Sequence, residues 1–136
     1  MTDIQATLSA AASGMRAQTV RMRIAAENVA NANSTGADPG EEPFRRRIPL
    51  METTTLASGA QGVRVTGAAF DMSAFGEEYN PSHPAAGADG YVLTPNVDTL
   101  VEMMDLREAT RAYEANLNMI EAARSMTARA LDLLRR

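Results

Sequence analysis

The sequence has no cysteine, no tryptophan and no lysine, and only 4% of its 136 residues are aromatic. Without cysteine, the chain can form no disulfide, no thiolate metal site and no thiol nucleophile. Because aromatic side chains are scarce, alanine and nine methionines supply much of the apolar 45%. These small or flexible side chains suit close packing between helices better than a bulky globular core.

Charge gives equally little support for a nucleic-acid partner. All 13 basic residues are arginine, and the formal net charge is −4. The one basic run, Arg45, Arg46 and Arg47, has a single aromatic neighbour, Phe44. A nucleic-acid patch combines more charge with interleaved aromatic residues. We therefore expect no nucleic-acid partner, and the run either contacts acidic surfaces of neighbouring subunits or lies in a solvated turn.

Long apolar runs are absent too. No segment approaches the ~18 consecutive apolar residues of a membrane span. Residues 1–15 lack the basic start and unbroken apolar core of a cleaved signal peptide. We expect no direct membrane insertion, and a cytoplasmic location unless the chain leaves by a route that needs no cleaved signal.

The sequence also lacks any pattern that would support catalysis. Ser13–Gly14 and Ser82–His83 are isolated pairs without an orienting third group, and no glycine-rich phosphate loop is present. His83 is the only histidine and has no acid pair at metal-ligand spacing. We expect His83 in a turn, bonded to the backbone or to a neighbour. The sequence predicts no enzyme, no metal and no cofactor.

Hydrophobic periodicity predicts a long helix near each end of the chain. The first runs from Asp3 to about Asn33, where apolar residues repeat every three or four positions over four heptads. Its two sets of seam positions are Leu8, Met15, Met22 and Val29, and Ile4, Ala11, Gln18 and Ala25. Such a helix would be about 45 Å long, too long for a compact domain of this size to enclose.

The second predicted helix runs from about Val97 to Leu134, with Thr94 or Asn96 as its N-cap. Its seam positions are Met103, Leu106, Thr110, Tyr113, Leu117, Ile120, Arg124, Thr127, Leu131 and Leu134. Beside this seam lie small residues that would let another backbone approach closely, namely Ala109, Ala123 and Ala130.

The middle of the chain differs in kind, because residues 37–94 hold most of the prolines and glycines. Val63 and Val65 alternate with polar residues, which predicts short extended segments, and the stretch Tyr79–Tyr91 is rich in turn residues. We therefore predict a mainly α chain. Two long terminal helices (1–36 and 95–136) form an antiparallel coiled-coil-like hairpin, joined by an irregular arm with a short β-hairpin (37–94).

A hairpin of two helices would leave apolar residues uncovered outside the seams. These residues are Val20, Ile24, Met119, Met126 and Leu133. Exposed apolar surface of that size marks an association site. The pattern predicts a subunit that completes its core with copies of itself or with relatives.

The first predicted helix ends in the segment ENVANANSTG, which places Asn28, Asn31 and Asn33 within six residues. Asparagine is a poor helix former because its amide competes for backbone groups. The cluster therefore either stops the helix, with Asn33 or Gly36 in the left-handed conformation, or bonds a neighbouring chain through Asn28 and Asn31. Both interpretations can hold on different asparagines.

Several stretches resemble one family, the flagellar axial proteins. SGMRAQTVRMRIAAENVANANSTG (Ser13–Gly36) resembles their N-terminal signature, and EMMDLREATRAYEANLNMIEAARSM (Glu102–Met126) resembles the C-terminal helix shared by rod and hook proteins. EPFRRRIP (Glu42–Pro49) and YNPSHPAAGADGYVLTPNV (Tyr79–Val97) resemble the proximal rod protein of the bacterial basal body. The short middle fits this resemblance, since distal rod and hook proteins carry larger inserts.

The resemblance implies a structural subunit that stacks helically into the proximal rod, transmits torque and lines the export channel. Its implied partners are copies of itself, other rod proteins (FlgB, FlgF and FlgG types) and the rod-base adaptor FliE. The flagellar type III export apparatus would deliver it to the periplasm without signal cleavage. The alternatives are a distal rod or hook-type axial protein, a cytoplasmic helical adaptor or chaperone, and an enzyme accessory subunit.

The expected contacts fall into two sets. The predicted subunit-interface residues are Leu8, Met15, Met22, Asn28, Val29, Asn31, Tyr113, Asn116, Leu117, Ile120, Leu131 and Leu134. The predicted arm contacts are Phe44, Arg45, Arg46, Arg47, Tyr79 and His83.

Overall fold

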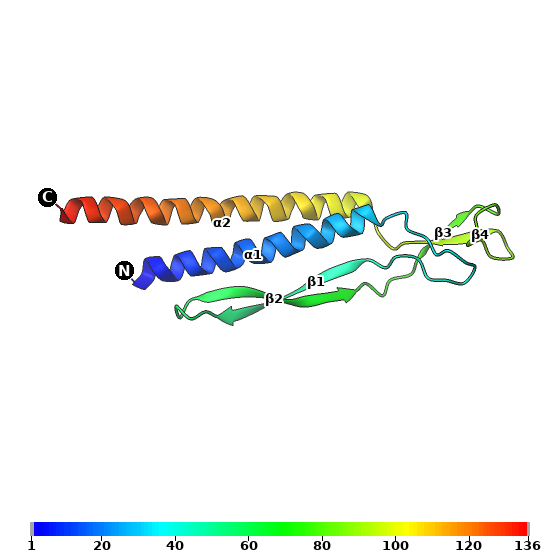
Figure 1. Cartoon of the computed structure of the whole chain (residues 1–136), viewed down its shortest axis with the longest axis horizontal. Coiled ribbons are helices and arrows are strands. Elements are labelled where there is room, and N and C mark those ends of the chain that lie inside the picture. Colours follow the sequence, from blue (N-terminus) through cyan, green and yellow to red (C-terminus); the bar gives the residue numbers. More distant parts are fainter. Residues whose placement is uncertain (1, 136) are drawn as a thin grey trace.

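The computed structural model describes residues 2–135, in which two long helices flank an extended arm (Figure 1). The helices lie side by side and run in opposite directions, and the arm carries two short antiparallel sheets. The predicted combination of two terminal helices and a small β insert is confirmed. In chain order the elements are α1 (Thr2–Ala30), β1 (Arg47–Thr55), β2 (Gln61–Phe70), β3 (Gly76–Tyr79), β4 (Tyr91–Thr94) and α2 (Thr99–Leu134).

Small residues bring α2 close to α1, which is the only helix or strand within residues 2–135 that α2 contacts. The least exposed row of α2 repeats every three or four residues and comprises Leu106, Ala109, Tyr113, Asn116, Ile120, Ala123 and Thr127. Ala109 is fully buried. Asn116 lies against Gly14 of α1, where an added Cβ would come within 2.9 Å of the Asn116 amide nitrogen.

The predicted seam of α2 is correct at Leu106, Tyr113, Ile120 and Thr127 and displaced by one residue at the positions between them. It is wrong at Leu131 and Leu134, which are exposed. In the row that faces α1, Ala109, Asn116 and Ala123 replace the predicted and exposed Thr110, Leu117 and Arg124. Sequence periodicity favours the larger Leu117 as a core residue. Packing favours the small residues instead, because they let the two helix backbones approach closely.

The hairpin of β1 and β2 lies along another side of α1 (Figure 1). Its register pairs Arg47 with Phe70 and Thr55 with Gln61, with an irregularity between Leu50 and Met51. A bulge of this kind increases the local twist of a strand pair. The twisted hairpin therefore presents different strand edges to α1 along its length.

This hairpin covers helix surface that the sequence predicted would need a second chain. Ile24 is only 3% exposed, and Val20 is half-buried beside Val65 of β2. The association role predicted for Val20 and Ile24 is therefore wrong. The arm of the same chain folds back over them, through residues too distant in sequence for helical periodicity to reveal.

The strands β3 and β4 form a second hairpin at the far end of the arm (Figure 1). The rings of Tyr79 and Tyr91 pack edge to face, with centroids 5.3 Å apart. Gly90 has a φ of +83°, and an added Cβ would lie 2.7 Å from the Tyr79 ring. Only glycine fits there, because other residues would meet both backbone strain and a clash.

The start of α2 differs from the predicted one. Its N-cap is Asp98, whose carboxylate accepts the backbone N–H of Leu100 at 2.9 Å. Neither Thr94 nor Asn96 caps the helix, because Thr94 belongs to β4 and the Asn96 side chain bonds the arm. Aspartate is a preferred N-cap residue, so Asp98 directly before Thr99 could have indicated the helix start. The sequence prediction placed the start earlier because it took Pro95 as part of the first turn.

Candidate functional site

Near the end of α1, the side-chain amide of Asn28 bonds both backbone groups of Arg47, as an adjacent strand would. Its Oδ1 accepts the backbone N–H of Arg47 at 3.0 Å, and its Nδ2 donates to the Arg47 carbonyl at 2.8 Å. Nδ2 also donates to Glu102 Oε2 at 3.0 Å. Asn28 is 1% exposed. Its amide is thus used within its own chain, contrary to the predicted interchain bond.

Glu102, on the first turn of α2, is a buried carboxylate with a cationic partner. It is 2% exposed and forms an ion pair with the guanidinium of Arg46. Arg46 also lies 3.4 Å from Asp71 Oδ2 and 3.7 Å from Asp105 Oδ2. A buried carboxylate without partners would be strongly unfavourable. Arg46 and Asn28 together satisfy Glu102 from two different segments.

The pKa values of this ion-pair network reflect its geometry. Burial by itself would lower the pKa of Arg46, but hydrogen bonds and charge interactions with Glu102 and Asp71 outweigh it and raise that pKa. The pKa of Asp71 is lowered, chiefly because the backbone N–H of Ser73 donates to its carboxylate, with the Ser73 side chain and Arg46 contributing. Both groups are therefore held in their charged forms.

Asn96 joins three segments of the arm. Its Oδ1 accepts the backbone N–H of Arg46 at 2.8 Å, and its Nδ2 donates to the Asp71 carbonyl at 2.8 Å. The same nitrogen lies 3.0 Å from Ser73 Oγ. We call the linked residues the junction cluster: Asn28, Arg46, Arg47, Asp71, Asn96 and Glu102.

The junction cluster has the chemistry of a structural joint. Its charges are paired, and its amides bond backbone groups of other segments. Within residues 2–135 there is no group of three or more side chains that could hold a metal ion. In the same part of the chain, no helix is long and apolar enough to cross a membrane. What the cluster can do is hold α1, α2 and the arm in one fixed arrangement.

The other two asparagines act at the end of α1. Asn31 Nδ2 donates to the Glu27 carbonyl at 2.8 Å, and Asn31 Oδ1 accepts the Ser34 hydroxyl at 3.1 Å. Both bonds are local, so Asn31 helps to end the helix, and its amide is used within its own chain instead of in the predicted bond to a neighbouring chain. The left-handed conformation predicted for Asn33 or Gly36 is wrong, since neither has a positive φ. Gly36 is instead needed for space, because an added Cβ would lie 2.7 Å from the Glu41 carbonyl oxygen.

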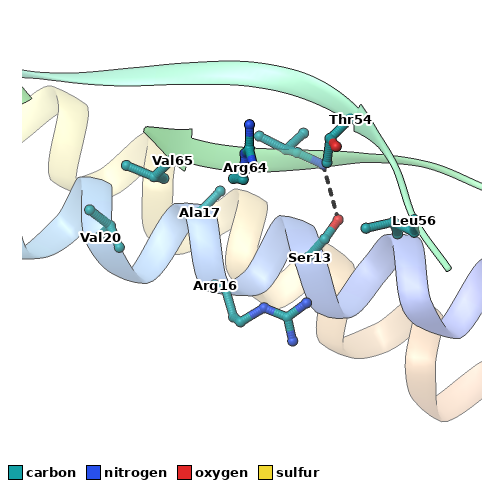
Figure 2. A pocket seen from close by; sticks show the side chains of 9 residues that line it. Ser13, Arg16, Ala17, Val20, Thr54, Leu56, Arg64 and Val65 are labelled. Atoms are coloured by element: carbon teal, nitrogen blue, oxygen red, sulfur yellow. Dashed lines mark hydrogen bonds between the residues drawn. The ribbon is translucent and has the colours of Figure 1, made fainter. Parts of the chain in front are cut away.

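Ser13 holds the hairpin to α1 at a second point (Figure 2). It is 2% exposed, and its Oγ accepts the backbone N–H of Val63 at 3.1 Å. Asn28 binds β1 through Arg47, whereas Ser13 binds β2 through Val63, so α1 holds both strands of the twisted hairpin. A groove of about 390 Å³ remains between them, lined in part by Arg16, Val20, Leu56 and Arg64.

The structure separates the predicted interface residues by their exposure. Leu8, Met15, Met22 and Val29 on α1 are half-buried, as are Tyr113, Asn116 and Ile120 in the α2 row that faces α1. Three are exposed on α2, namely Leu117 (39%), Leu131 (52%) and Leu134 (84%). Further exposed apolar residues on α2 are Leu100, Val101, Met103, Met104, Met119, Met126 and Leu133. The outer face of α2 is therefore the apolar surface open to another chain.

The arginine run of the arm bonds groups of its own chain. Arg45 lies over the Phe75 ring at 4.1 Å from its centroid and donates to the Asp71 carbonyl at 3.1 Å. Arg47 lies 3.5 Å from a Glu27 carboxylate oxygen. The sequence offered a solvated turn or a neighbouring subunit, and these intrachain partners replace both interpretations.

The remaining predicted arm contacts differ in exposure. Phe44 is half-buried, whereas Tyr79 is 64% exposed at the arm's far hairpin. His83 lies in a turn, as predicted, where its Nδ1 accepts the backbone N–H of Ala85 at 3.0 Å and its Nε2 lies 3.3 Å from Thr35 Oγ1.

Sequence reasoning missed four residues that hold the chain together: Ser13, Asp71, Asn96 and Glu102. Ser13 drew attention only as a possible nucleophile, and Asn96 only as a helix cap. Of these four residues, only Glu102 could have been noticed from the sequence, because it is a charged residue next to the apolar row of α2. Its partners, Asn28 and Arg46, lie more than fifty residues away in sequence.

Known proteins match this chain over almost its full length. The family model described as Flagella basal body rod protein matches residues 8–37, and that described as Flagellar basal body rod FlgEFG protein C-terminal matches residues 88–133. Flagellar basal-body rod protein FlgC of Agrobacterium fabrum is 42% identical, covering 99% of this chain and 98% of its own length. The Bacillus subtilis protein of that name is 37% identical, covering 93% of this chain and 95% of its own length. The Aquifex aeolicus protein of that name is 35% identical, covering 97% of this chain and 98% of its own length.

Proposed function

Since the chain belongs to the FlgC family of flagellar basal-body rod proteins, we propose that the outer face of α2 is where it joins other rod subunits. The chain is a structural subunit of the basal-body rod and not an enzyme, and it assembles with other rod components. Family membership decides against a helical adaptor, a chaperone or an enzyme accessory subunit. The FlgC relatives also favour this role over a distal rod or hook-type protein.

The observation that carries the proposal is an excess of exposed surface, with exposed apolar side chains concentrated on α2. The chain exposes 9152 Å², whereas a folded monomer of its 14.6 kDa mass exposes about 6,900 Å². Among residues 2–135, ten of the seventeen exposed large hydrophobic side chains lie on α2. Neighbouring subunits would bury this surface, which no other element of the chain covers.

In the assembled rod, residues 1–36 and 95–136 form an inner coiled-coil domain along the export channel, and the arm of residues 37–94 lies outside it. The three-and-four spacing of the row on α2 that faces α1 supports this arrangement. The junction cluster suits torque transmission, because paired polar groups around the buried Asn28 and Glu102 resist bending between the helices and the arm.

The neighbours of this subunit are copies of itself, rod proteins of the FlgB, FlgF and FlgG types, and the adaptor FliE. The flagellar type III apparatus exports the chain to the periplasm without cleaving a signal. One feature of the sequence supports this route, because a chain without cysteine carries no disulfide that would prevent threading through a narrow channel.

Removal of residues 131–136 tests the proposal. Leu131, Leu133 and Leu134 are 52%, 76% and 84% exposed, so the truncated protein should keep its circular dichroism spectrum and unfolding midpoint. Its incorporation into basal bodies and the swimming of the cells should fall sharply. In the matched control, Arg129, Asp132 and Arg135 are replaced by alanine, which leaves the apolar residues in place. Normal motility with the truncated chain would contradict the proposed role of α2.

A further inference from the structure

Within residues 2–135, the hairpin of β3 and β4 packs against no other helix or strand. It lies beyond the ends of both helices (Figure 1). Its register places Tyr79 beside Tyr91 and Glu77 beside Leu93, and side chains of cross-strand partners lie on the same face of a sheet. Tyr79, Tyr91 and Leu93 are 64%, 46% and 37% exposed. We call the face formed by Glu77, Tyr79, Tyr91 and Leu93 the tip face.

The charges around the tip face are acidic. Glu41 and Asp89 line a hollow of about 180 Å³ together with three tip-face residues, Glu77 among them, and no arginine lines it. All three carboxylates are exposed. The stretches 36–44 and 76–94 contain six acidic residues and no arginine. A partner of the tip face is therefore apolar where it meets the tyrosines and basic at its border.

The same chain carries a groove between α1 and the β1–β2 hairpin. The hollow drawn in Figure 2 shares Val20 and Val65 with a second hollow, and Arg16 and Leu56 with a third. The three hollows therefore adjoin and form one groove along α1, which we call the α1 groove. Its apolar lining includes Ala17, Val20, Ile24, Leu56, Val63 and Val65.

Every charged side chain that lines the α1 groove is an arginine. These residues are Arg16, Arg23, Arg47 and Arg64. Figure 2 shows the groove with Arg16 on the side of α1 and Arg64 on the side of β2. Two glutamates outside the lining, Glu27 and Glu52, pair with three of the arginines. Arg16 is exposed and forms no ion pair within residues 2–135. The groove therefore joins net positive charge to an apolar lining.

We propose that the tip face of one copy docks in the α1 groove of a neighbouring copy. This inference rests on the proposed function, because it requires copies that assemble in the rod, but it uses surfaces other than the outer face of α2. The tip projects beyond the helices (Figure 1), and the groove is concave, so a projecting surface meets a hollow one. The contact is between chains, since β3 and β4 contact neither α1 nor β2 of their own chain.

The chemistry of the two surfaces selects this pairing. Tyrosine is common at the centre of protein interfaces, because it buries a large, rigid side chain and keeps a hydroxyl group for hydrogen bonding. The two tyrosines and Leu93 would meet the apolar lining, and the carboxylates would face the arginines. Tip against tip would bring only acids together, and groove against groove only arginines, so charge opposes both like pairings. The contact joins different surfaces of identical chains and can therefore repeat from copy to copy.

Charge reversal tests the contact. Glu77 and Arg16 are exposed, and neither side chain forms an ion pair within residues 2–135, so Glu77→Arg and Arg16→Glu should leave the circular dichroism spectrum unchanged. Each variant alone would place like charges opposite each other, and its incorporation into basal bodies should fall to a small fraction of the natural level. The double variant restores opposite charges, so its incorporation should return close to the natural level.

A matched control separates a specific contact from an effect of net charge. Glu77→Arg with Arg111→Glu has the same net charge as the first double variant, but Arg111 is exposed on α2 and does not line the α1 groove. This second pair should incorporate no better than either of its single variants.

Cross-linking gives a measurement that does not depend on restored assembly, because the natural chain has no cysteine. One chain carries Glu77→Cys and another Arg16→Cys, and both are produced beside the natural chain so that basal bodies form. A short bismaleimide cross-linker should give a band at twice the chain mass when both variants are present. Either variant without the other should give no such band.

The outcomes separate this inference from the proposed function. Normal incorporation of both single charge variants would overturn the contact between tip and groove, as would equal restoration by Arg111→Glu. Loss of incorporation with Glu77→Arg that Arg16→Glu does not restore, together with no band from the mixed cysteine chains, would mean that a different protein holds the tip. That result would also overturn the proposal and leave the rod role intact. Absence of the unmodified chain from basal bodies would instead contradict the proposed function.

Discussion

At the residue scale, a few buried polar side chains hold the helices and the arm together. Glu102, Asn28 and Ser13 are the largest side chains that are fully buried, and each bonds a residue far away in sequence. Leaving a buried polar group without its partner costs about 1–3 kcal/mol. Exposed polar contacts are worth much less, because water replaces them.

Asn28→Ala should therefore destabilise the free chain strongly. It would leave the backbone N–H and carbonyl of Arg47 and one oxygen of Glu102 without their partner. We expect a loss of about 1–3 kcal/mol for each group that stays buried and unpaired, measured by urea unfolding. Asn33→Ala is the matched control, since Asn33 is exposed and should change stability by less than about 0.5 kcal/mol. Equal stability of the two variants would contradict the intrachain role of Asn28.

Asp71 should make folding sensitive to acid. Its pKa is lowered in the folded protein, so its contribution to stability is complete above the ordinary aspartate pKa of about 4. That contribution is lost as the pH falls through the lower folded value. The difference in unfolding free energy between the natural chain and Asp71→Asn should be largest near neutral pH and shrink below about pH 4. Urea unfolding across this range measures it, with the exposed Asp38→Asn as control.

At the scale of elements, α1 is the central element, because it packs against α2 and against the β1–β2 hairpin. Small residues on α2 permit the first contact, and Ser13 and Asn28 fix the second. The hairpin therefore does for α1 what a further helix would do in a bundle. This leaves α2 as the helix with an uncovered apolar face.

Ala109→Leu should disrupt the contact between the two helices. Ala109 is completely buried in the row that faces α1, and added methylene groups in a close-packed site cost about 1–3 kcal/mol. Thermal unfolding should show a lower midpoint. The matched control is Ala128→Leu, which adds the same side chain at an exposed position of the same helix. A midpoint unchanged by Ala109→Leu would mean that the helices do not pack closely at this row.

At the scale of the whole molecule, the chain is elongated, and both its helices and its arm present extensive surface (Figure 1). Such a shape leaves more surface exposed than is usual for a folded monomer of its mass. The same shape suits a subunit whose surface is completed by neighbours. Removal of residues 131–136 belongs to this scale, because it measures assembly and not the fold of one chain.

The sequence by itself determined the helices, the arm between them and the family. Helical periodicity depends on neighbouring residues, so most of this information is local in the chain. Stretches that contain ENVANANSTG and RAYEAN carry the resemblance to the family, and they can be read directly as strings of residues. The β-hairpin was predicted from alternation for the same reason.

Only the tertiary structure decided the partners of these residues. An asparagine amide offers the same donors and acceptor to its own backbone, to the arm or to another chain, so sequence could not choose among them for Asn28. The choice of Asn116 over Leu117 in the row facing α1 depends on how closely two backbones approach, which no single helix specifies. The cover over Ile24 comes from a strand some forty residues away. Packing and buried hydrogen bonds bring distant residues together, and periodicity within one segment carries no record of them.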